Sequence, residues 1–246
     1  MDLSGKIQDD IVRLKDYRAK ELSLSGPSPS ELAPFIDHTL LKPDATASDI
    51  RTLCAEAIHH KFKTVCVNSS WIPLCNQLLY SSNSSCVPIA VVGFPFGAGL
   101  SASKAIEAKM AIENGAREID MVLPIGRLRG KEYDYVHHDI KTVHDACGDV
   151  PLKIILETSM LTREEIIGAC VICREVGVAF VKTSTGFGGG GAKSDDVQLM
   201  KAVVGDGVEV KASGGIRTYE NAIEMYNAGA RRIGASASVA IVTKHM

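Results

Sequence analysis

Short apolar runs alternate with longer amphipathic segments eight times between residue 34 and the C-terminus. This alternation is typical of βαβ units and a parallel sheet. Strands are expected near 35–36, 64–67, 89–93, 118–123, 152–157, 179–182, 208–211 and 232–234. Helices are expected near 47–60, 69–80, 101–114, 131–146, 162–176, 194–204, 218–228 and 236–243. Eight repeats in 246 residues predict an α/β chain folded as a (β/α)8 TIM barrel.

The main alternative is an open, doubly wound sheet, which would need a nucleotide-binding fingerprint after its first strand. Here the first expected strand is followed by the sequence DHTLLKP, residues 37–43, so the closed barrel is favoured. Ahead of the barrel, Ile7, Ile11 and Leu14 have helical spacing, and a turn-rich segment follows at 23–31. The predicted organisation is an N-terminal helix and linker over 1–33 and one barrel domain over 34–246.

The charge of the chain is nearly balanced, with 27 basic and 29 acidic residues. Nucleic acid and anionic membranes are therefore disfavoured as partners. No N-terminal signal sequence and no apolar stretch approaching the ~20 residues of a membrane span is present. Seven cysteines, an odd number spread through helices and strands, are typical of reduced thiols, so we expect a cytoplasmic protein.

Two lysines stand inside apolar, strand-like runs, Lys182 in AFVKTSTG (179–186) and Lys211 in VEVKASGG (208–215). Burying an unpaired ammonium is costly, so such lysines are either paired or kept for chemistry. A second ammonium at about 4 to 6 Å disfavours the protonated form of the first by roughly 3 to 4 kcal/mol. The pair therefore predicts a neutral lysine able to attack a carbonyl and form a Schiff base.

Asp120 introduces a carboxylate into the apolar run EIDMVLP, residues 118–124. It has two interpretations, a structural ion-pair partner of a strand lysine or a proton relay during imine formation. The presence of Lys182 and Lys211 on other strands of the same barrel favours the relay. Lys153, at the start of its strand, is interpreted as a supporting ion-pair partner of Asp120.

Glycine-rich turns follow the last two strands, Gly214-Gly215 after the seventh and Gly234-Ala-Ser236 after the eighth. Barrels often bind phosphate in these two loops, through backbone N–H groups and a short helix. The alternative is that the glycines only make tight turns. After the sixth strand, Gly186 extends the same rim, and the glycines at 188–191 suggest a mobile loop.

Metal chemistry is disfavoured. Cys170 and Cys173 form a C-x-x-C inside a helical pattern without a second pair, so core packing explains them better than zinc or redox function. The histidines show no metal-binding spacing. We therefore predict no metal site and no cofactor.

Four motifs in order, IDHTLLKP (36–43), EIDMVLP (118–124), FVKTSTG (180–186) and VKASGGIR (210–217), resemble the class I deoxyribose-phosphate aldolase family. The resemblance covers about residues 34–242. It implies that Lys182 is the Schiff-base lysine, that Lys211 lowers its pKa, and that Asp120 relays protons. It also implies phosphate-binding or sugar-bordering positions, namely Gly186, Gly214, Gly215, Gly234 and Ser236 for phosphate, and Asp37, Thr39 and Cys66 for the sugar.

The chain departs from this family at three places. Phe187 stands where some relatives have a lysine, which removes a possible cationic phosphate contact. Ala237 replaces a second serine of some relatives, and the segment 242–246 lacks the terminal tyrosine of part of the family.

The resemblance implies reversible cleavage of 2-deoxy-D-ribose 5-phosphate to D-glyceraldehyde 3-phosphate and acetaldehyde, without a cofactor. The alternatives are a barrel isomerase, another imine-forming aldolase acting on a different phosphosugar, and a non-catalytic binding protein. Small phosphorylated sugars and aldehydes are the expected partners, with a homodimer as the default assembly.

Overall fold

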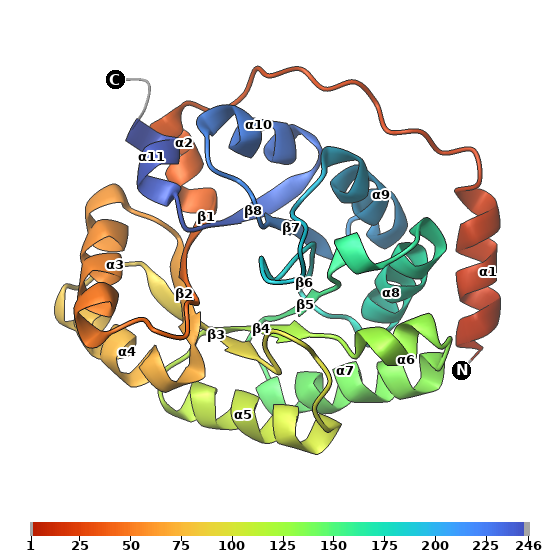
Figure 1. Ribbon diagram of the computed structural model, residues 1–246, viewed down its shortest axis with the longest axis horizontal. Coiled ribbons are helices and arrows are strands. Elements are labelled where there is room, and N and C mark those ends of the chain that lie inside the picture. The colour runs from red at the N-terminus through yellow and green to blue at the C-terminus, as the bar shows by residue number, and fades with distance from the viewer. Residues whose placement is uncertain (1, 244–246) are drawn as a thin grey trace.

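Eight parallel strands form a closed barrel in the computed structural model, which describes residues 2–243 (Figure 1). The strands follow chain order around the barrel, and the last pairs with the first. Their bounds are β1 (Ile36–Leu40), β2 (Thr64–Asn68), β3 (Val87–Val92), β4 (Glu118–Val122), β5 (Leu152–Ile155), β6 (Phe180–Lys182), β7 (Glu209–Ser213) and β8 (Ala230–Ala235). The predicted (β/α)8 barrel is confirmed.

Helices follow the strands and surround the barrel (Figure 1). They are α3 (Ala47–His60), α4 (Ile72–Ser81), α5 (Ser101–Glu113), α7 (Tyr133–Cys147), α8 (Arg163–Val176), α9 (Ser194–Val204), α10 (Tyr219–Asn227) and α11 (Ser238–Thr243). These agree with the predicted helices to within a few residues. The sequence patterns do not predict α6 (Ile125–Arg129), because five residues are too few to show an amphipathic period. Single 3₁₀ turns also occur, η1 (Ala33–Phe35), η2 (Ser69–Trp71) and η3 (Thr158–Met160).

Strand β1 differs most from its prediction, which covered only 35–36 and left Asp37 in the following loop. Its sequence IDHTL contains three polar residues, so the apolar pattern that reveals a strand is missing. Asp37 is nevertheless fully buried inside the barrel. Asp37 is accepted there because it pairs with Lys211 on β7 and Arg232 on β8, partners that a sequence pattern does not show.

Two apolar clusters flank the strands. The main cluster lies between the outward-facing strand residues and the helices, and includes Val65, Val67, Met121 and Ile154. A small second cluster consists of Leu41, Cys66, Ile89 and Val91, with Phe94 packed against it. Alternation of side chains along a strand places Cys66 of β2 and Ile89 and Val91 of β3 in this inner cluster. The charged side chains inside the barrel come instead from β1 and from β4 to β8.

The N-terminal extension begins with α1 (Leu3–Arg13), which packs against α8. Leu3, Ile7 and Leu14 are buried in the main cluster. Arg174 on α8 donates to the Asp10 carboxylate at 2.8 Å. The extension therefore shares the core of the barrel, although the division at residue 33 stays a prediction.

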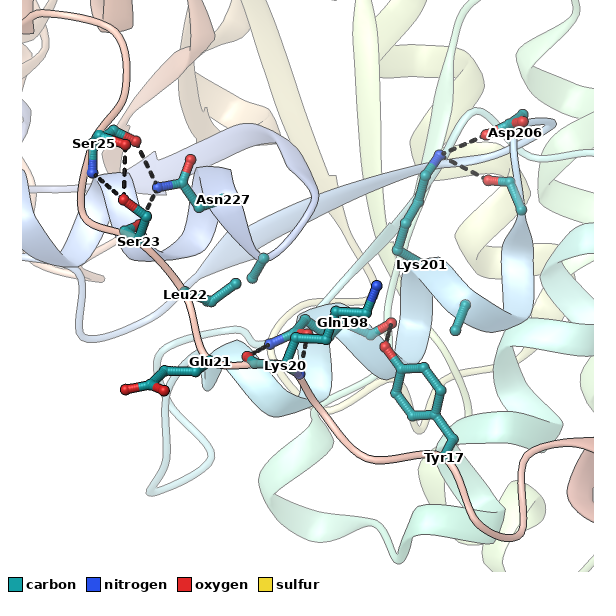
Figure 2. A pocket seen from close by; sticks show the side chains of 13 residues that line it. Tyr17, Lys20, Glu21, Leu22, Ser23, Ser25, Gln198, Lys201, Asp206 and Asn227 are labelled. Atoms are coloured by element: carbon teal, nitrogen blue, oxygen red, sulfur yellow. Dashed lines mark hydrogen bonds and ion pairs between the residues drawn. The ribbon is translucent and has the colours of Figure 1, made fainter.

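From α1 the chain crosses α9 and α10 to α2 (Pro29–Leu32), as a long connection without regular structure (Figure 1). Figure 2 shows the side chains that attach it to the barrel. Gln198 on α9 exchanges two hydrogen bonds with the backbone of Lys20, at 2.8 and 3.1 Å. Asn227 at the end of α10 donates to the carbonyl oxygens of Ser23 and Ser25.

Across residues 2–243, no helix combines the length and the apolar character that crossing a membrane requires. The departure from the family at 242–246, the missing terminal tyrosine, falls on a segment most of which lies outside the described residues.

Candidate active site

Lys182 and Lys211 are direct neighbours on adjacent strands. Lys182 is the last residue of β6, and the strand register pairs it with Lys211 on β7. Both side chains are buried, with 3% and 0% of their surface exposed. The two lysines therefore meet inside the barrel toward the carboxyl ends of the strands, where barrel enzymes carry out their chemistry.

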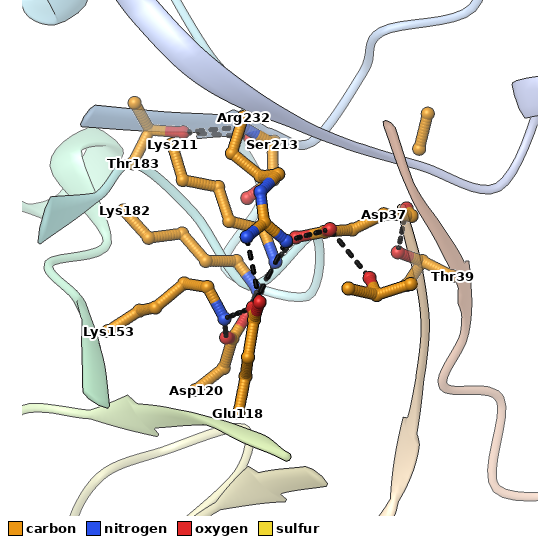
Figure 3. A network of polar contacts seen from close by, with 12 residues as sticks. Asp37, Thr39, Glu118, Asp120, Lys153, Lys182, Thr183, Lys211, Ser213 and Arg232 are labelled. Carbon is orange, nitrogen blue, oxygen red and sulfur yellow. Dashed lines mark hydrogen bonds and ion pairs between the residues drawn. The ribbon is translucent and has the colours of Figure 1, made fainter. Parts of the chain in front are cut away.

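Asp120 on β4 connects both lysines (Figure 3). Its Oδ2 lies 2.8 Å from Lys182 Nζ and 2.7 Å from Lys211 Nζ. The two nitrogens are thus no more than about 5.5 Å apart, the sum of these distances. Lys153 on β5 donates to the other oxygen, Oδ1, at 2.8 Å, so the predicted pairing with Asp120 is present.

The three lysines determine the protonation of Asp120. Burial would raise the pKa of this carboxyl, but the charges of Lys153, Lys182 and Lys211 hold the pKa of Asp120 well below its usual range. Asp120 is therefore an ionised acceptor at neutral pH.

Lys211 has a second carboxylate partner, Asp37 Oδ2 at 2.5 Å. Burial would lower the pKa of Lys211, but the charges of Asp120 and Asp37 hold it above its usual range. Lys211 is therefore a fixed ammonium. By contrast, Asp120 is the one carboxylate within ion-pair distance of Lys182 among residues 2–243.

A further layer of charge, which sequence analysis missed, lies behind these residues. Arg232 on β8 donates to Asp37 Oδ1 at 2.6 Å and to Glu118 Oε1 at 2.8 Å. Glu118 on β4 also contacts Lys153, at 2.6 Å. A sequence signal exists: Glu118 stands two residues before Asp120 on the same strand, so both side chains face the barrel interior.

These groups form one buried network of three carboxylates and four cations. The carboxylates are Asp37, Glu118 and Asp120, and the cations are Lys153, Lys182, Lys211 and Arg232. With every group ionised, the network carries one excess positive charge. Loss of one proton by a lysine balances it.

A pocket of about 310 Å³ opens above this network. Its lining includes Lys182 and six of the predicted substrate positions, Thr39, Gly186, Gly214, Gly215, Gly234 and Ser236. The structure therefore brings these residues together. Asp37 and Cys66 are fully buried and are not among the described residues that line the pocket. Burial also raises the pKa of the Cys66 thiol, which keeps it protonated.

Glycine is required at the positions around the pocket for different structural reasons. Gly186, Gly214 and Gly215 have φ of 87°, 90° and 77°, which side chains adopt only with strain. Gly234 instead gives room to Lys211, because a Cβ there would lie 3.2 Å from Lys211 Cε. The Lys211 side chain therefore packs directly against the backbone of Gly234.

The loop between β6 and α9 contains the glycines at 188–191, which the sequence suggested as a mobile loop. In the structure they allow close contacts. A Cβ on Gly190 would lie 2.4 Å from Ser159 Cβ, and one on Gly191 would lie 2.5 Å from the Gly214 carbonyl oxygen. The backbone N–H of Ala192 donates to that same oxygen at 3.0 Å, which joins this loop to the Gly214 turn.

Sequence analysis did not identify two cationic side chains that line the pocket. Lys42 from the loop after β1 and Arg217 from the loop after β7 both line it. Lys42 and Arg217 stand near the ends of the motifs IDHTLLKP and VKASGGIR. This position was the sequence signal that could have identified them. Phe187 also lines the pocket and packs edge-on against Phe94, with ring centroids 5.4 Å apart. At position 187 the pocket wall is thus apolar.

Within the described residues, no cluster of histidine, cysteine and carboxylate side chains has the geometry to hold a metal ion. Cys170 and Cys173 are buried in the helix α8 and pack in the core, as expected.

The fold and this site define a barrel enzyme whose centre is a buried group of lysines around one carboxylate. Residues 32–244 match the model of the DeoC/LacD family aldolases. The chain belongs to this family and is an aldolase, a carbon–carbon lyase.

Curated relatives are similar over most of their length. The chain is 54% identical over 214 residues to the deoxyribose-phosphate aldolase of Mycoplasma capricolum, covering 87% of this chain and 96% of that one. It is 52% identical to that of Clostridium tetani, covering 86% and 98%.

Solved structures of similar proteins have the same fold. A Coccidioides immitis protein described as a candidate deoxyribose-phosphate aldolase has a TM-score of 0.94 at 42% identity, covering 99% of this chain and 96% of that one. The tetrameric Aeropyrum pernix deoxyribose phosphate aldolase has a TM-score of 0.79 at 29% identity, covering 96% and 95%.

Proposed function

We propose that this aldolase reversibly cleaves 2-deoxy-D-ribose 5-phosphate to D-glyceraldehyde 3-phosphate and acetaldehyde through a Schiff base on Lys182. The substrate is supported by the names of the relatives at 52–54% identity. The mechanism is supported by one observation above all: Lys182 lies at the pocket and shares an Asp120 oxygen with the fixed ammonium of Lys211.

The charge of the network favours Lys182 as the neutral amine. Lys153, Lys211 and Arg232 each contact two carboxylates, whereas Lys182 contacts one in the described part of the chain, Asp120. At about 5.5 Å and an effective dielectric constant of about 20, two ammonium groups repel by about 3 kcal/mol. Deprotonation of Lys182 is therefore opposed by the fewest carboxylates. It also makes the positive and negative charges of the network equal in number.

The reaction then follows from the position of this amine. Lys182 Nζ attacks C1 of the open-chain aldehyde, and loss of water from the carbinolamine gives a protonated imine. The imine accepts the electron pair of the C2–C3 bond as that bond breaks, while the C3 hydroxyl loses its proton and D-glyceraldehyde 3-phosphate leaves. The enamine is protonated at C2, and water releases acetaldehyde and free Lys182.

Asp120 is the group best placed to move protons in these steps. Its Oδ2 is within hydrogen-bond distance of both Lys182 and Lys211. Once Lys182 has added to the aldehyde, this oxygen can accept a proton from the carbinolamine and return it as water leaves. Lys153 holds Asp120 from the opposite side and is itself paired with Glu118.

The far end of the pocket is suited to the phosphate. Gly186, Gly214 and Gly215 offer backbone that a phosphate can approach closely, and Ser236 offers a hydroxyl. Lys42 and Arg217 add positive charge at the same pocket. No cofactor is needed for this chemistry, and the compartment and the oligomeric state stay predictions, cytoplasm and a homodimer.

Incubation with 2-deoxy-D-ribose 5-phosphate and borohydride, followed by peptide mass spectrometry, tests the proposal. We expect a reduced adduct on Lys182, together with release of acetaldehyde in the absence of borohydride. An adduct on another lysine would refute the assignment. Cleavage of ribose 5-phosphate or another sugar phosphate in preference to the deoxy sugar would favour the rival phosphosugar aldolase.

A further inference from the structure

Glu157 has a backbone conformation that is unfavourable for its residue type. It follows β5 with φ 58° and ψ 61°, the left-handed region, which is strained for a residue with a side chain and favours glycine. A residue kept there in spite of this strain is a candidate for a functional role.

The carboxyl group of Glu157 is also buried in an unusual way. Only 1% of the residue is exposed, and Oε1 has no hydrogen-bond partner in the described part of the chain. A buried carboxyl oxygen without a partner destabilises the fold. The side chain is therefore not explained by stability.

The other oxygen, Oε2, holds the loop that follows β6. It accepts hydrogen bonds from the backbone N–H of Thr185, at 3.2 Å, and from the Thr185 hydroxyl. That hydroxyl in turn accepts from the backbone N–H of Phe187 at 2.9 Å. One carboxylate thus fixes both sides of the turn at Gly186.

The loop that follows lies directly on this carboxylate. A Cβ on Gly188 would lie 2.5 Å from Glu157 Cδ and 2.7 Å from Oε2, so only glycine allows the approach. Since Thr185, Gly186 and Phe187 all line the substrate pocket, Glu157 supports this wall from behind.

We infer that Glu157 is a positioning residue that holds the Thr185–Phe187 wall of the pocket in the shape that receives the phosphate of the substrate. It does not touch the reacting atoms. The inference rests on the proposed function, because the ligand of this wall comes from that proposal. Its expected signature is weakened binding of phosphorylated ligands with a smaller effect on the chemical step.

Two substitutions of Glu157 separate positioning from stability. Glu157→Ala removes the acceptor and keeps the strained backbone, whereas Glu157→Gly removes the acceptor and relieves the strain. Glu157→Gly should therefore unfold at a higher temperature than Glu157→Ala. Both should raise KM for 2-deoxy-D-ribose 5-phosphate about tenfold, with kcat changed less than threefold. If Glu157 acts only on stability, the glycine variant will have the KM of the wild type, and the inference fails.

Conservative and neighbouring variants complete the test. Glu157→Gln keeps an oxygen that can accept from Thr185, so its KM should stay within about threefold of the wild type. Thr185→Val should raise KM, and combining it with Glu157→Gly should add little, because both changes break the same contact. Full additivity would contradict the inference. Glu113→Ala, at the exposed end of α5, is the control for loss of a carboxylate and should leave KM unchanged.

Phosphate dependence distinguishes this inference from the proposed function. The loss in kcat/KM should be much smaller with unphosphorylated 2-deoxy-D-ribose. Equal losses with both sugars would overturn the positioning of a phosphate wall. Binding of inorganic phosphate, measured by calorimetry, should be about tenfold weaker in Glu157→Gly than in the wild type. A wild-type protein that binds phosphate but does not cleave the sugar would refute the proposed function and leave this comparison intact.

Discussion

Lys182 and Lys211 donate to the same oxygen of Asp120, from paired positions on adjacent strands. Their environments differ, because Lys211 is also bound by Asp37 while Lys182 faces the substrate pocket. The arrangement gives the two lysines different tasks. Lys211 remains an ammonium, and in the proposed mechanism Lys182 is the attacking amine.

Replacing Lys182 by alanine should abolish turnover. The substitution removes the only amine at the pocket floor that the proposed mechanism uses, so kcat should fall by about three orders of magnitude or more. Borohydride with substrate should give no adduct on the variant. The exposed Lys109 on α5 provides the control, since Lys109→Ala should keep wild-type turnover. A substantial residual rate in Lys182→Ala would exclude this residue as the Schiff-base lysine.

Lys211→Leu should lower kcat at neutral pH about a hundredfold and move the pH optimum upward by about one to two units. Without this fixed ammonium, the remaining network has three carboxylates and three cations, so Lys182 keeps its proton to higher pH. The measurement is kcat against pH, with circular dichroism to confirm folding. An unchanged pH profile would remove Lys211 from the role of keeping Lys182 neutral.

The place of these residues shows how far the sequence could predict the site. Lys182, Lys211 and Asp120 were found because a charge in an apolar strand is exceptional. Which oxygen they share could not be predicted, because it depends on the register of three strands that are distant in the sequence. Arg232 was missed because it stands near the start of an expected strand, where an arginine usually reaches solvent.

The fold was more predictable than the loops. Eight repeats of apolar strand and amphipathic helix define the barrel, whereas the polar strand β1 has no such pattern. The glycines at 188–191 suggested mobility because glycine permits it. Their contacts with Glu157, Ser159 and Gly214 give another reason, the close approach of the loop to its neighbours, which only coordinates reveal.

Asp37 should contribute stability that disappears in acid. Burial would raise the pKa of Asp37, but Lys211, Arg232 and Lys153 lower it from 3.8 to about 2. Because the folded-state pKa is the lower one, this stability is present in full above about pH 4 and is lost as the pH falls toward 2. The shift corresponds to about 2 kcal/mol of unfolding free energy.

Urea unfolding at several pH values between 5 and about 2 checks this contribution. The free energy of unfolding of Asp37→Asn should fall less steeply with decreasing pH than that of the wild type, by about 2 kcal/mol over the range. Asp9→Asn, on the exposed side of α1, should follow the wild type. Parallel curves for Asp37→Asn and the wild type would show that Asp37 has no depressed pKa in the folded state.

Lys42 should supply charge for the phosphate that Phe187 does not supply. Both side chains line the same pocket, so a cation at either position can reach a ligand there. Lys42→Gln should raise KM for 2-deoxy-D-ribose 5-phosphate about tenfold, in the range of a charge-assisted hydrogen bond. The rate with unphosphorylated 2-deoxy-D-ribose should not change.

Adding Phe187→Lys to Lys42→Gln should restore much of the affinity, because it returns a positive charge to the pocket. The exposed Lys63, which precedes β2 at the opposite end of the barrel, is the matched control, and Lys63→Gln should behave as the wild type. A tenfold loss with both sugars, or no recovery in the double variant, would mean that Lys42 acts on the shape of the β1 loop and not through its charge.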